Sequence, residues 1–488
     1  MQMSNLPEYR LQKLKTIKEL GIQPWPERFE ITHTLTAAAQ LPDGTEKVRV
    51  AGRIVALRKL GKLTFAHLQD VEGRVQIALK QDLLGDAYKA FHKIIDIGDF
   101  VGITGSTFTT KTGEKTIMTE EYQFLGKALR ELPEKWHGLT DIELRYRQRY
   151  LDLITNAESR RVALIRSRLI KALRNFLDER GFIEVETPIL TNQPSGALAR
   201  PFQTHHNALG IDVYLRIAPE TYLKRLVVGG FTHVYEIARN FRNEGISPVH
   251  LQDFTMVEGY SAYWNYEDNM KLMRSMILYL LEKVFGTYEI QIGEHLIDFS
   301  QEWPVVTFRE LILKDAGIDI NAYPDGPSLL AAIREKGIQL EHENLEALGK
   351  GNLIDVLYKK VSRPKIIAPT FLTAHPIELS PLARRNDEDP TVADRFQLIV
   401  NGAEIINAYS ELVDPIDQRQ RLEEQARLRS QGDEEAMPLD HDYLLAMEHG
   451  MPPISGWGMG IDRLLQVLLD LPNIRDSILF PLMRPQHE

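Results

Sequence analysis

The hydrophobic pattern of the chain changes character after its first quarter. From Val48 to about Leu125, apolar and polar positions alternate, and glycines interrupt the alternation. This period of two predicts short strands, and several of them in so short a stretch indicate a small β-barrel. Before the strands, a basic segment that ends at Gly21 predicts a short helix within residues 1–30.

From Arg145 onward the pattern mixes helical and strand periods. Apolar residues recur every four positions from Ile165 to Leu177 and predict an amphipathic helix that ends at Gly181. The other expected elements are strands over 213–217, 254–260 and 396–411, a helix over 273–284, helices within 315–365, and a glycine-rich turn that leads into a helix over 461–471. Because strands and helices do not alternate regularly, we expect an α+β domain rather than a βαβ series.

A polar segment that contains proline, residues 131–135, separates the two patterns. We therefore expect two domains. The first spans residues 1–140 and holds the N-terminal helix and the barrel. The second spans residues 141–488 and carries a helical insertion at about 315–365. A chain of 488 residues is long enough for about three domains or lobes, so this division is compatible with its length.

Composition narrows the class of protein. Apolar residues make up 43% and charged residues 26% of the chain, close to the average for globular proteins, which excludes wholesale disorder. No apolar run approaches the roughly 20 residues that cross a bilayer. The absence of cysteine excludes disulfides and cysteine nucleophiles. We expect a cytoplasmic protein without membrane association, and its net charge of −10 means that a polyanionic partner must meet a local basic patch.

Such a patch lies in the predicted barrel. Six basic residues and no acidic residue stand between Lys47 and Lys62, and Phe65 and Gln76 follow on neighbouring predicted strands. A basic barrel face with an aromatic residue is typical of proteins that stack single-stranded bases. The alternative is a solvated sheet face with Phe65 in the barrel core.

Residues 235–245 and 254–260 predict two strands joined by a loop. Arg242 and Glu244 stand at the mouth of the loop, and a period of two puts Phe254, Glu258 and Tyr260 on one face of the second strand. The planar fork of an arginine suits a phosphate. A carboxylate beside a stacking phenylalanine suits the amino group of adenine. The alternative is an exposed hairpin joined by salt bridges.

Two further segments carry candidate chemistry. Residues 455–463 match neither a dinucleotide fingerprint nor a P-loop, but their alternating glycines leave one strand face bare for a flat ligand, and Arg463 follows. In the strand over 403–411, Asn407, Tyr409 and Glu411 share one face, where a cationic group would satisfy them. Glu404 falls on the opposite face unless a bulge intervenes.

Taken together and in order, these segments resemble the class II aminoacyl-tRNA synthetases, and specifically the bacterial-type lysyl-tRNA synthetases. The three motifs of the class are matched by residues 181–188, 239–244 and 458–463, and lysyl-like segments occur at 195–202, 218–220, 382–385 and 474–481. The resemblance covers nearly the whole chain. It implies an OB-fold barrel that binds the tRNA anticodon and a catalytic domain built on an antiparallel sheet flanked by helices.

The resemblance also implies a role for each matching residue. ATP, as a substrate, would contact Arg242, Glu244, His250, Phe254 and Arg463, of which Arg242 and Arg463 would be catalytic. Lysine would contact Gly196, Glu220, Tyr260, Asn407, Tyr409 and Glu411. Magnesium would be bound by Glu404, and Phe65, Gln76 and Glu114 would read the anticodon of tRNA(Lys). The first motif builds the dimer interface in this family, so a homodimer is expected.

Two departures from the family pattern matter. Gln397 stands where the family usually has a second metal carboxylate, and an amide oxygen is the weaker ligand, so fewer magnesium ions are expected. Val249, with residues 251–253, replaces an arginine-containing run that orders the loop on ATP and tRNA. Two other functions stay open. One is a paralogue that passes an activated lysine to another acceptor, and the other is a tRNA-binding protein with weakened catalysis.

Overall fold

The computed structural model describes residues 6–133, 139–342, 344–430 and 437–486. Residues 134 and 135 of the predicted connecting segment lie outside this set. By its contacts the chain forms two compact units, residues 1–161 and 162–488. No helix in the part of the chain that the structure describes is both long and apolar enough to cross a membrane.

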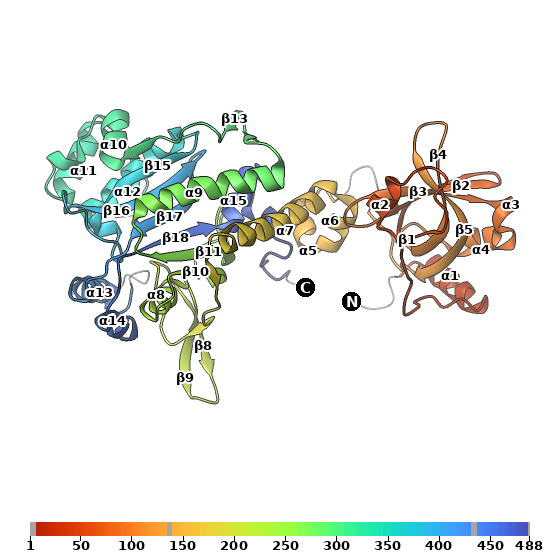
Figure 1. The fold of residues 1–488 in the computed structure, drawn as a ribbon, viewed down its shortest axis with the longest axis horizontal. Coiled ribbons are helices and arrows are strands. Elements are labelled where there is room, and N and C mark those ends of the chain that lie inside the picture. The colour runs from red at the N-terminus through yellow and green to blue at the C-terminus, as the bar shows by residue number, and fades with distance from the viewer. Residues whose placement is uncertain (1–5, 134–138, 343, 431–436, 487–488) are drawn as a thin grey trace. The chain divides into compact units, whose positions relative to one another are not determined.

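The first unit is a closed barrel with strand order β1-β2-β3-β5-β4 (Figure 1). Its strands are β1 (Val48–Leu60), β2 (Leu63–Gln69), β3 (Arg74–Lys80), β4 (Phe100–Thr109) and β5 (Lys115–Gly126). Its helices are α1 (Glu8–Glu19), α2 (Leu35–Ala39), α3 (Gln81–Leu84), α4 (Asp86–Ile94), α5 (Ile142–Arg147) and α6 (Arg149–Thr155). Alternation along β2 buries Thr64, Ala66 and Leu68, so Phe65 faces outward. The predicted barrel is confirmed, and the alternative that put Phe65 in its core is wrong.

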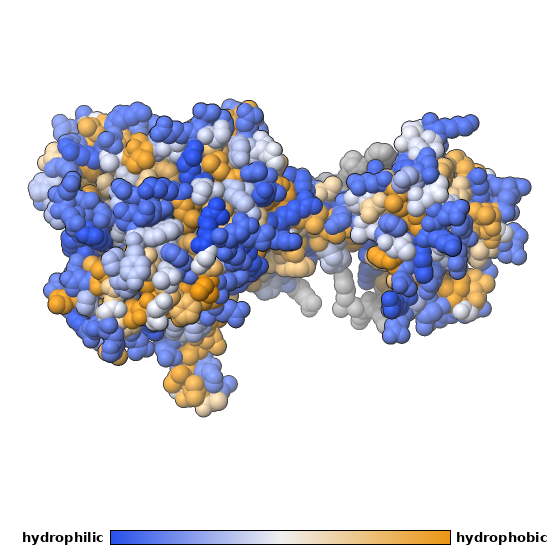
Figure 2. Space-filling view, viewed as in Figure 1, coloured by the Kyte–Doolittle hydropathy of each residue, from blue (hydrophilic) through white to orange (hydrophobic). Residues whose placement is uncertain are grey.

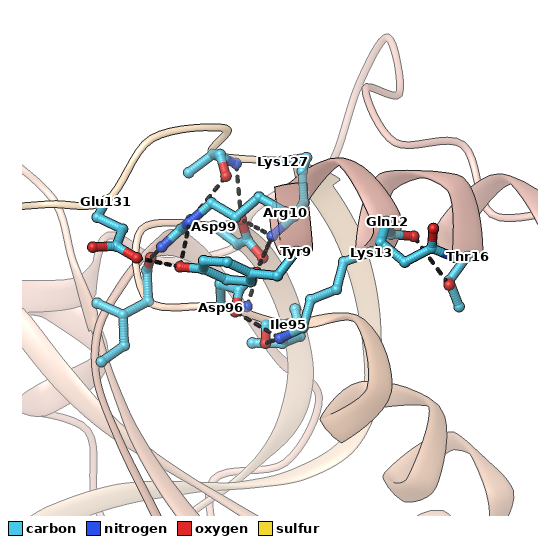
Figure 3. Close-up of polar contacts among 12 residues, drawn as sticks. Tyr9, Arg10, Gln12, Lys13, Thr16, Ile95, Asp96, Asp99, Lys127 and Glu131 are labelled. Atoms are coloured by element: carbon cyan, nitrogen blue, oxygen red, sulfur yellow. Dashed lines mark hydrogen bonds and ion pairs between the residues drawn. The ribbon is translucent and has the colours of Figure 1, made fainter. Parts of the chain in front are cut away.

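A network of buried charges fastens α1 to the barrel (Figure 3). The ammonium of Lys127 is fully buried and lies 2.6 Å from Asp96 and 2.9 Å from Asp99. Lys13 of α1 reaches the other oxygen of Asp96 at 2.6 Å. The guanidinium of Arg10 donates to the carbonyl oxygens of residues 97 and 128. The helix is therefore attached through groups that would be costly to leave unpaired.

Replacing Lys127 by methionine is expected to destabilise this unit by about 3–5 kcal/mol, because Asp99 is left buried without its cation. Hydrogen exchange of the full chain, followed by mass spectrometry, should show faster exchange in α1 and in the barrel. Lys89→Met is the matched control, since Lys89 pairs with Asp86 on the surface. Equal exchange in the two variants would contradict the expected role of Lys127.

The second unit is built on an eight-stranded sheet, ordered β14-β15-β16-β17-β18-β11-β10-β6. The strands are β14 (Val305–Thr307), β15 (Thr370–Pro376), β16 (Val392–Val400), β17 (Ala403–Ser410), β18 (Ile454–Gly460), β11 (Asp253–Ala262), β10 (His233–Phe241) and β6 (Ile183–Glu184). All neighbours are antiparallel except the two outermost pairs, β14–β15 and β10–β6. Two small sheets, β7 (Leu190–Thr191) with β9 (Ile211–Leu215) and β8 (Phe202–His206), and β12 (Glu289–Ile292) with β13 (His295–Asp298), complete the strands.

Helices cover one face of this sheet along its centre, whereas on the other face helices pack only toward its two ends. Apolar side chains of α7 (Ala157–Asp178), α9 (Tyr266–Leu280) and α15 (Ile461–Leu468) form a single core with alternate residues of the central strands, and Figure 1 shows α7 and α9 running across the sheet. The remaining helices are α8 (Glu220–Val228), α10 (Phe308–Ala316), α11 (Gly326–Glu335), α12 (Lys350–Val361), α13 (Pro415–Ser430) and α14 (His441–Glu448). The α+β organisation is confirmed. Helices α11 and α12 lie within the helical insertion predicted at about 315–365, and together with α10, which begins before it, they pack on a core that includes Leu372 of β15 and Ile399 of β16.

Two of the predicted elements are wrong in detail. The strand expected over 396–411 is a hairpin, in which β16 and β17 are joined at Asn401 and Gly402, both with positive φ. The glycine-rich turn expected before the last helix is the central strand β18, paired with β11 and β17. Both differences bring more residues onto the pocket face of the sheet.

Candidate active site

A cavity of about 370 Å³ in the second unit lies on the sheet face opposite the helical core. The residues predicted for ATP, lysine and metal that line it are Gly196, Glu220, Arg242, Glu244, His250, Phe254, Tyr260, Glu404, Asn407, Tyr409 and Arg463. They come from the loop before β8, from α8, from the loop between β10 and β11, from β11 and β17 and from α15. The structure therefore gathers side chains that lie up to 267 positions apart in the chain.

Cationic and aromatic side chains occupy one end of the cavity. The guanidinium carbon of Arg242 lies 5.0 Å from the centre of the Phe254 ring. Arg242 has only a long contact of 3.5 Å from Nη2 to the carbonyl oxygen of Ile217, and its buried Nε has no hydrogen-bond partner. Arg463 donates to the carbonyl oxygen of Glu404 at 3.3 Å. Burial lowers the pKa of Arg242, because the nearby carboxylates do not fully compensate for the water that the guanidinium has lost.

Carboxylates and tyrosines occupy the other end. Tyr409 donates its hydroxyl to Glu220 at 2.6 Å, and the hydroxyl of Tyr260 donates to Glu258 at 3.3 Å. Burial, reinforced by the charge of Glu220, raises the pKa of Glu258 to about 8. Gly196 has φ +87°, and a Cβ there would stand 2.9 Å from the Cβ of Glu220, so a glycine allows the backbone to approach this carboxylate closely.

Glu411 lies next to this end but does not line the cavity. It is 2% exposed, and a Cβ on Gly456 would stand 2.4 Å from its Oε1 and 2.2 Å from the ring of Tyr260. Its Oε2 lies 2.5 Å from the ammonium of Lys224. Burial raises the pKa of Glu411 well above its usual range, although Lys224 opposes the shift. The carboxylate predicted to bind the ε-ammonium is therefore buried behind a glycine.

The alternative left open for Glu404 is resolved by a β-bulge. Leu398 pairs with Ile406 and Ile399 pairs with Glu404, so Ile405 is the extra residue in β17. The bulge turns Glu404 onto the face of Asn407 and into the cavity, so the expectation of an opposite face is wrong. Gln397, across from Asn407, donates its amide to Glu404 at 2.8 Å. Gln397 itself lines a smaller neighbouring cavity of about 190 Å³.

Three residues of the pocket region were missed by sequence reasoning. Lys224 stands four positions after Glu220, one turn later on the same helix, and that spacing was the available signal. Glu258 shares the strand face of Tyr260 and was noted there without a role. Arg395, two residues before Gln397, donates to Asn407 at 2.8 Å and lines both cavities.

A second group of predicted residues meets on the barrel. Glu114 precedes β5 and accepts from the amide of Gln76 at 2.6 Å and contacts His67 Nε2 at 2.7 Å. Because His67 pairs with Gln76 across β2 and β3, and Phe65 is two residues before His67, all three share the outer face. His67 was missed, although a period of two from Phe65 would have included it.

Family comparison identifies the two units. Residues 141–484 match the model of class II tRNA synthetases (D, K and N), and residues 48–125 match the model of the OB-fold nucleic acid binding domain. The sheet, the pocket and the barrel are thus those of a class II tRNA synthetase with a nucleic-acid-binding domain.

Individual relatives narrow this class. The chain is 49% identical to the lysine–tRNA ligase of Carboxydothermus hydrogenoformans, with 99% of both chains covered. It is 48% identical to that of Pelotomaculum thermopropionicum, covering 99% of this chain and 96% of the relative, and 47% identical to that of Moorella thermoacetica, covering 99% of both. The chain therefore belongs to the lysine–tRNA ligase family, and the resemblance drawn from its motifs is confirmed.

Proposed function

We propose that this chain is a lysine–tRNA ligase: it activates L-lysine with ATP to lysyl-adenylate and pyrophosphate, and then transfers lysine to the 3′ end of tRNA(Lys). The observation that carries the proposal is one cavity with arginines at one end and buried carboxylates at the other. The arginines at the first end suit the phosphates of a nucleoside triphosphate, and the carboxylates at the second end suit an amino acid that carries a second ammonium group.

The nucleotide end supplies electrostatic stabilisation. Arg242 is assigned to the α-phosphate and Arg463 to the γ-phosphate. Phe254 is assigned to stacking on adenine, and the adenine amino group would donate a hydrogen bond to Glu244. His250, bonded to Ser247 at 2.8 Å, lines the same wall and is assigned to ATP. Because these cations are already in place where negative charge develops on phosphorus, they stabilise the transition state and need not move during the reaction.

The amino acid end supplies orientation. Glu220 and the backbone at Gly196 are assigned to the α-ammonium, and Tyr260 and Glu411 to the ε-ammonium, with Asn407 and Tyr409 along the side chain. The lysine carboxylate is already a nucleophile at neutral pH, so no general base is required. The protein has to align this carboxylate with the α-phosphorus, opposite the departing pyrophosphate.

Magnesium fits the donor set near Glu404. A hard cation of this kind takes one or two carboxylate or amide oxygens and completes its shell with phosphate oxygens and water. Glu404 offers a carboxylate, and Gln397 offers an amide oxygen once its amide turns away from Glu404. The ion would neutralise charge on the phosphates when bound. No group of three histidine or acidic side chains fit to hold a metal occurs among the described residues.

The remaining assignments concern partners. We infer a homodimer through the first motif, in which Ile183 is 49% exposed. Ile189 and Leu190, directly after the motif, are 46% and 49% exposed, and apolar residues gather on the projecting β8–β9 hairpin in Figure 2. We place the anticodon-binding domain at residues 1–140, the catalytic domain at 141–488, and the protein in the cytoplasm.

Lysine-dependent exchange of pyrophosphate into ATP, followed by charging of tRNA(Lys), tests the proposal. Both reactions are expected. Exchange without charging would favour the paralogue with another acceptor, and the absence of both reactions would favour the tRNA-binding protein. Either result would overturn the proposed ligase activity.

Replacing Phe65 by alanine is expected to lower the efficiency of tRNA charging by about tenfold or more and to leave pyrophosphate exchange unchanged. A stacked base contributes about 1–3 kcal/mol, and Phe65 presents its ring on the outer face of the barrel. Leu83→Ala, another exposed apolar position of the same unit, is the control. Equal losses in exchange and charging would refute an anticodon role for Phe65.

A further inference from the structure

Lys224 is a fully buried cation that the proposed reaction does not use. Its side chain has no exposed surface, and its ammonium nitrogen lies 2.5 Å from Glu220 Oε1 and 2.5 Å from Glu411 Oε2. The rings of Tyr260, Tyr409 and Tyr443 surround the nitrogen at 5.6–5.9 Å from their centres. A resident ammonium therefore already occupies the kind of surroundings that the side-chain ammonium of lysine needs.

The two carboxylates that hold Lys224 are the ones assigned to the two ammonium groups of the substrate. Because each has an oxygen 2.5 Å from the same nitrogen, those oxygens lie within about 5 Å of each other. Two buried carboxylates this close share a proton unless a cation separates them. A shared proton would join Glu220 to Glu411 directly and turn both away from the substrate.

We propose that Lys224 is a positioning residue for lysine recognition: its ammonium takes the place of the shared proton, and so holds the carboxyl groups of Glu220 and Glu411 apart. This inference rests on the proposed function. Among the described residues, the other ionisable groups that face the pair are Glu258 and Tyr260 from β11, Tyr409 from β17, Tyr443 from α14, and Arg395 from β16, whose charge acts on Glu220. The three tyrosines stay neutral, because burial raises the pKa of each.

The test compares Lys224→Met and Lys224→Arg with the unchanged enzyme by lysine-dependent pyrophosphate exchange between pH 6 and 8.5. In Lys224→Met the KM for lysine is expected to rise about a hundredfold at pH 7, the scale of a buried ion pair that loses one partner. The KM for ATP is expected to stay within about twofold, because Lys224 does not line the nucleotide end of the cavity.

The pH profile separates positioning from a merely structural role. In Lys224→Met the pair loses the cation that opposes the upward shift of the Glu411 pKa, so kcat/KM for lysine should rise with pH more steeply than in the unchanged enzyme, by up to about tenfold per unit. Lys224→Arg keeps the charge and should keep the unchanged profile, even with a higher KM. Glu258 also titrates in this range and Lys224 lowers its pKa, so the profiles are compared in a Glu258→Gln background, where the difference reports on the pair. Lys271→Met, at an exposed lysine of α9, is the control.

Each outcome bears on one claim. If the unchanged enzyme shows no lysine-dependent exchange, the proposed function is wrong. If it is active but Lys224→Met keeps its pH profile and its lysine KM, the role of Lys224 alone is overturned. Should Lys224→Met fail to fold, a structure of the unchanged enzyme with lysine decides. Contact of Lys224 with both carboxylates supports the inference, and displacement of Lys224 from Glu411 overturns it.

Discussion

Replacing Gly456 by alanine is expected to lower kcat/KM for lysine about a thousandfold. The added Cβ would stand 2.2 Å from Cε1 of Tyr260 and 2.4 Å from Oε1 of Glu411, and neither distance is tolerated. The ring and the carboxylate cannot both keep their places, so the end of the cavity assigned to the ε-ammonium is lost. Losing a buried ion pair with the substrate typically costs about 3–5 kcal/mol, which corresponds to a decrease in kcat/KM of this size.

Two other glycine-to-alanine variants serve as controls. At Gly458 the new Cβ would meet the flexible end of Met256 at 3.1 Å, so a loss below about tenfold is expected there. At Gly349 nothing lies within 4 Å, and activity should be unchanged. The three variants are compared by pyrophosphate exchange at varied lysine and by thermal unfolding. A Gly456→Ala protein that binds lysine normally would show that this end of the cavity does not hold the side chain.

Local periodicity was enough to predict the two architectures. The period of two in β2 and β3 gave the barrel, and the period of four in α7 gave the helix behind the sheet. The hairpin between β16 and β17 was missed even though its signal is local. Asn401 and Gly402 both have positive φ, and Asn-Gly between two apolar runs is a strong hairpin signal.

The pocket depends on features that no local pattern contains. The face of Glu404 is set by one extra residue, Ile405, opposite β16, and a bulge depends on the partner strand. The burial of Glu411 behind Gly456 requires β17 and β18 to be neighbours, which is a long-range property. The family resemblance named these residues, but only the fold shows that a lysine of α8 already neutralises part of the acidic end.

Replacing Arg242 by methionine is expected to lower the rate of pyrophosphate exchange about a thousandfold while leaving the free protein at least as stable. The two effects have one cause. The buried Nε of Arg242 has no partner in the protein, so its desolvation is compensated only when a phosphate arrives. Removing a fixed cation that faces the negative charge developing on phosphorus typically lowers the reaction rate by a factor of this size. Arg242→Lys should recover little, because an ammonium cannot donate as a planar fork.

Thermal unfolding with and without ATP checks both halves of this expectation. ATP should raise the melting temperature of the unchanged protein clearly and that of Arg242→Met much less, since ligand stabilisation follows affinity. Arg309→Met is the matched control, because Arg309 pairs with Asp319 on the surface of the helical insertion. A melting temperature well below that of the unchanged protein would mean that Arg242 supports the fold. Its lost activity would then carry no information about ATP.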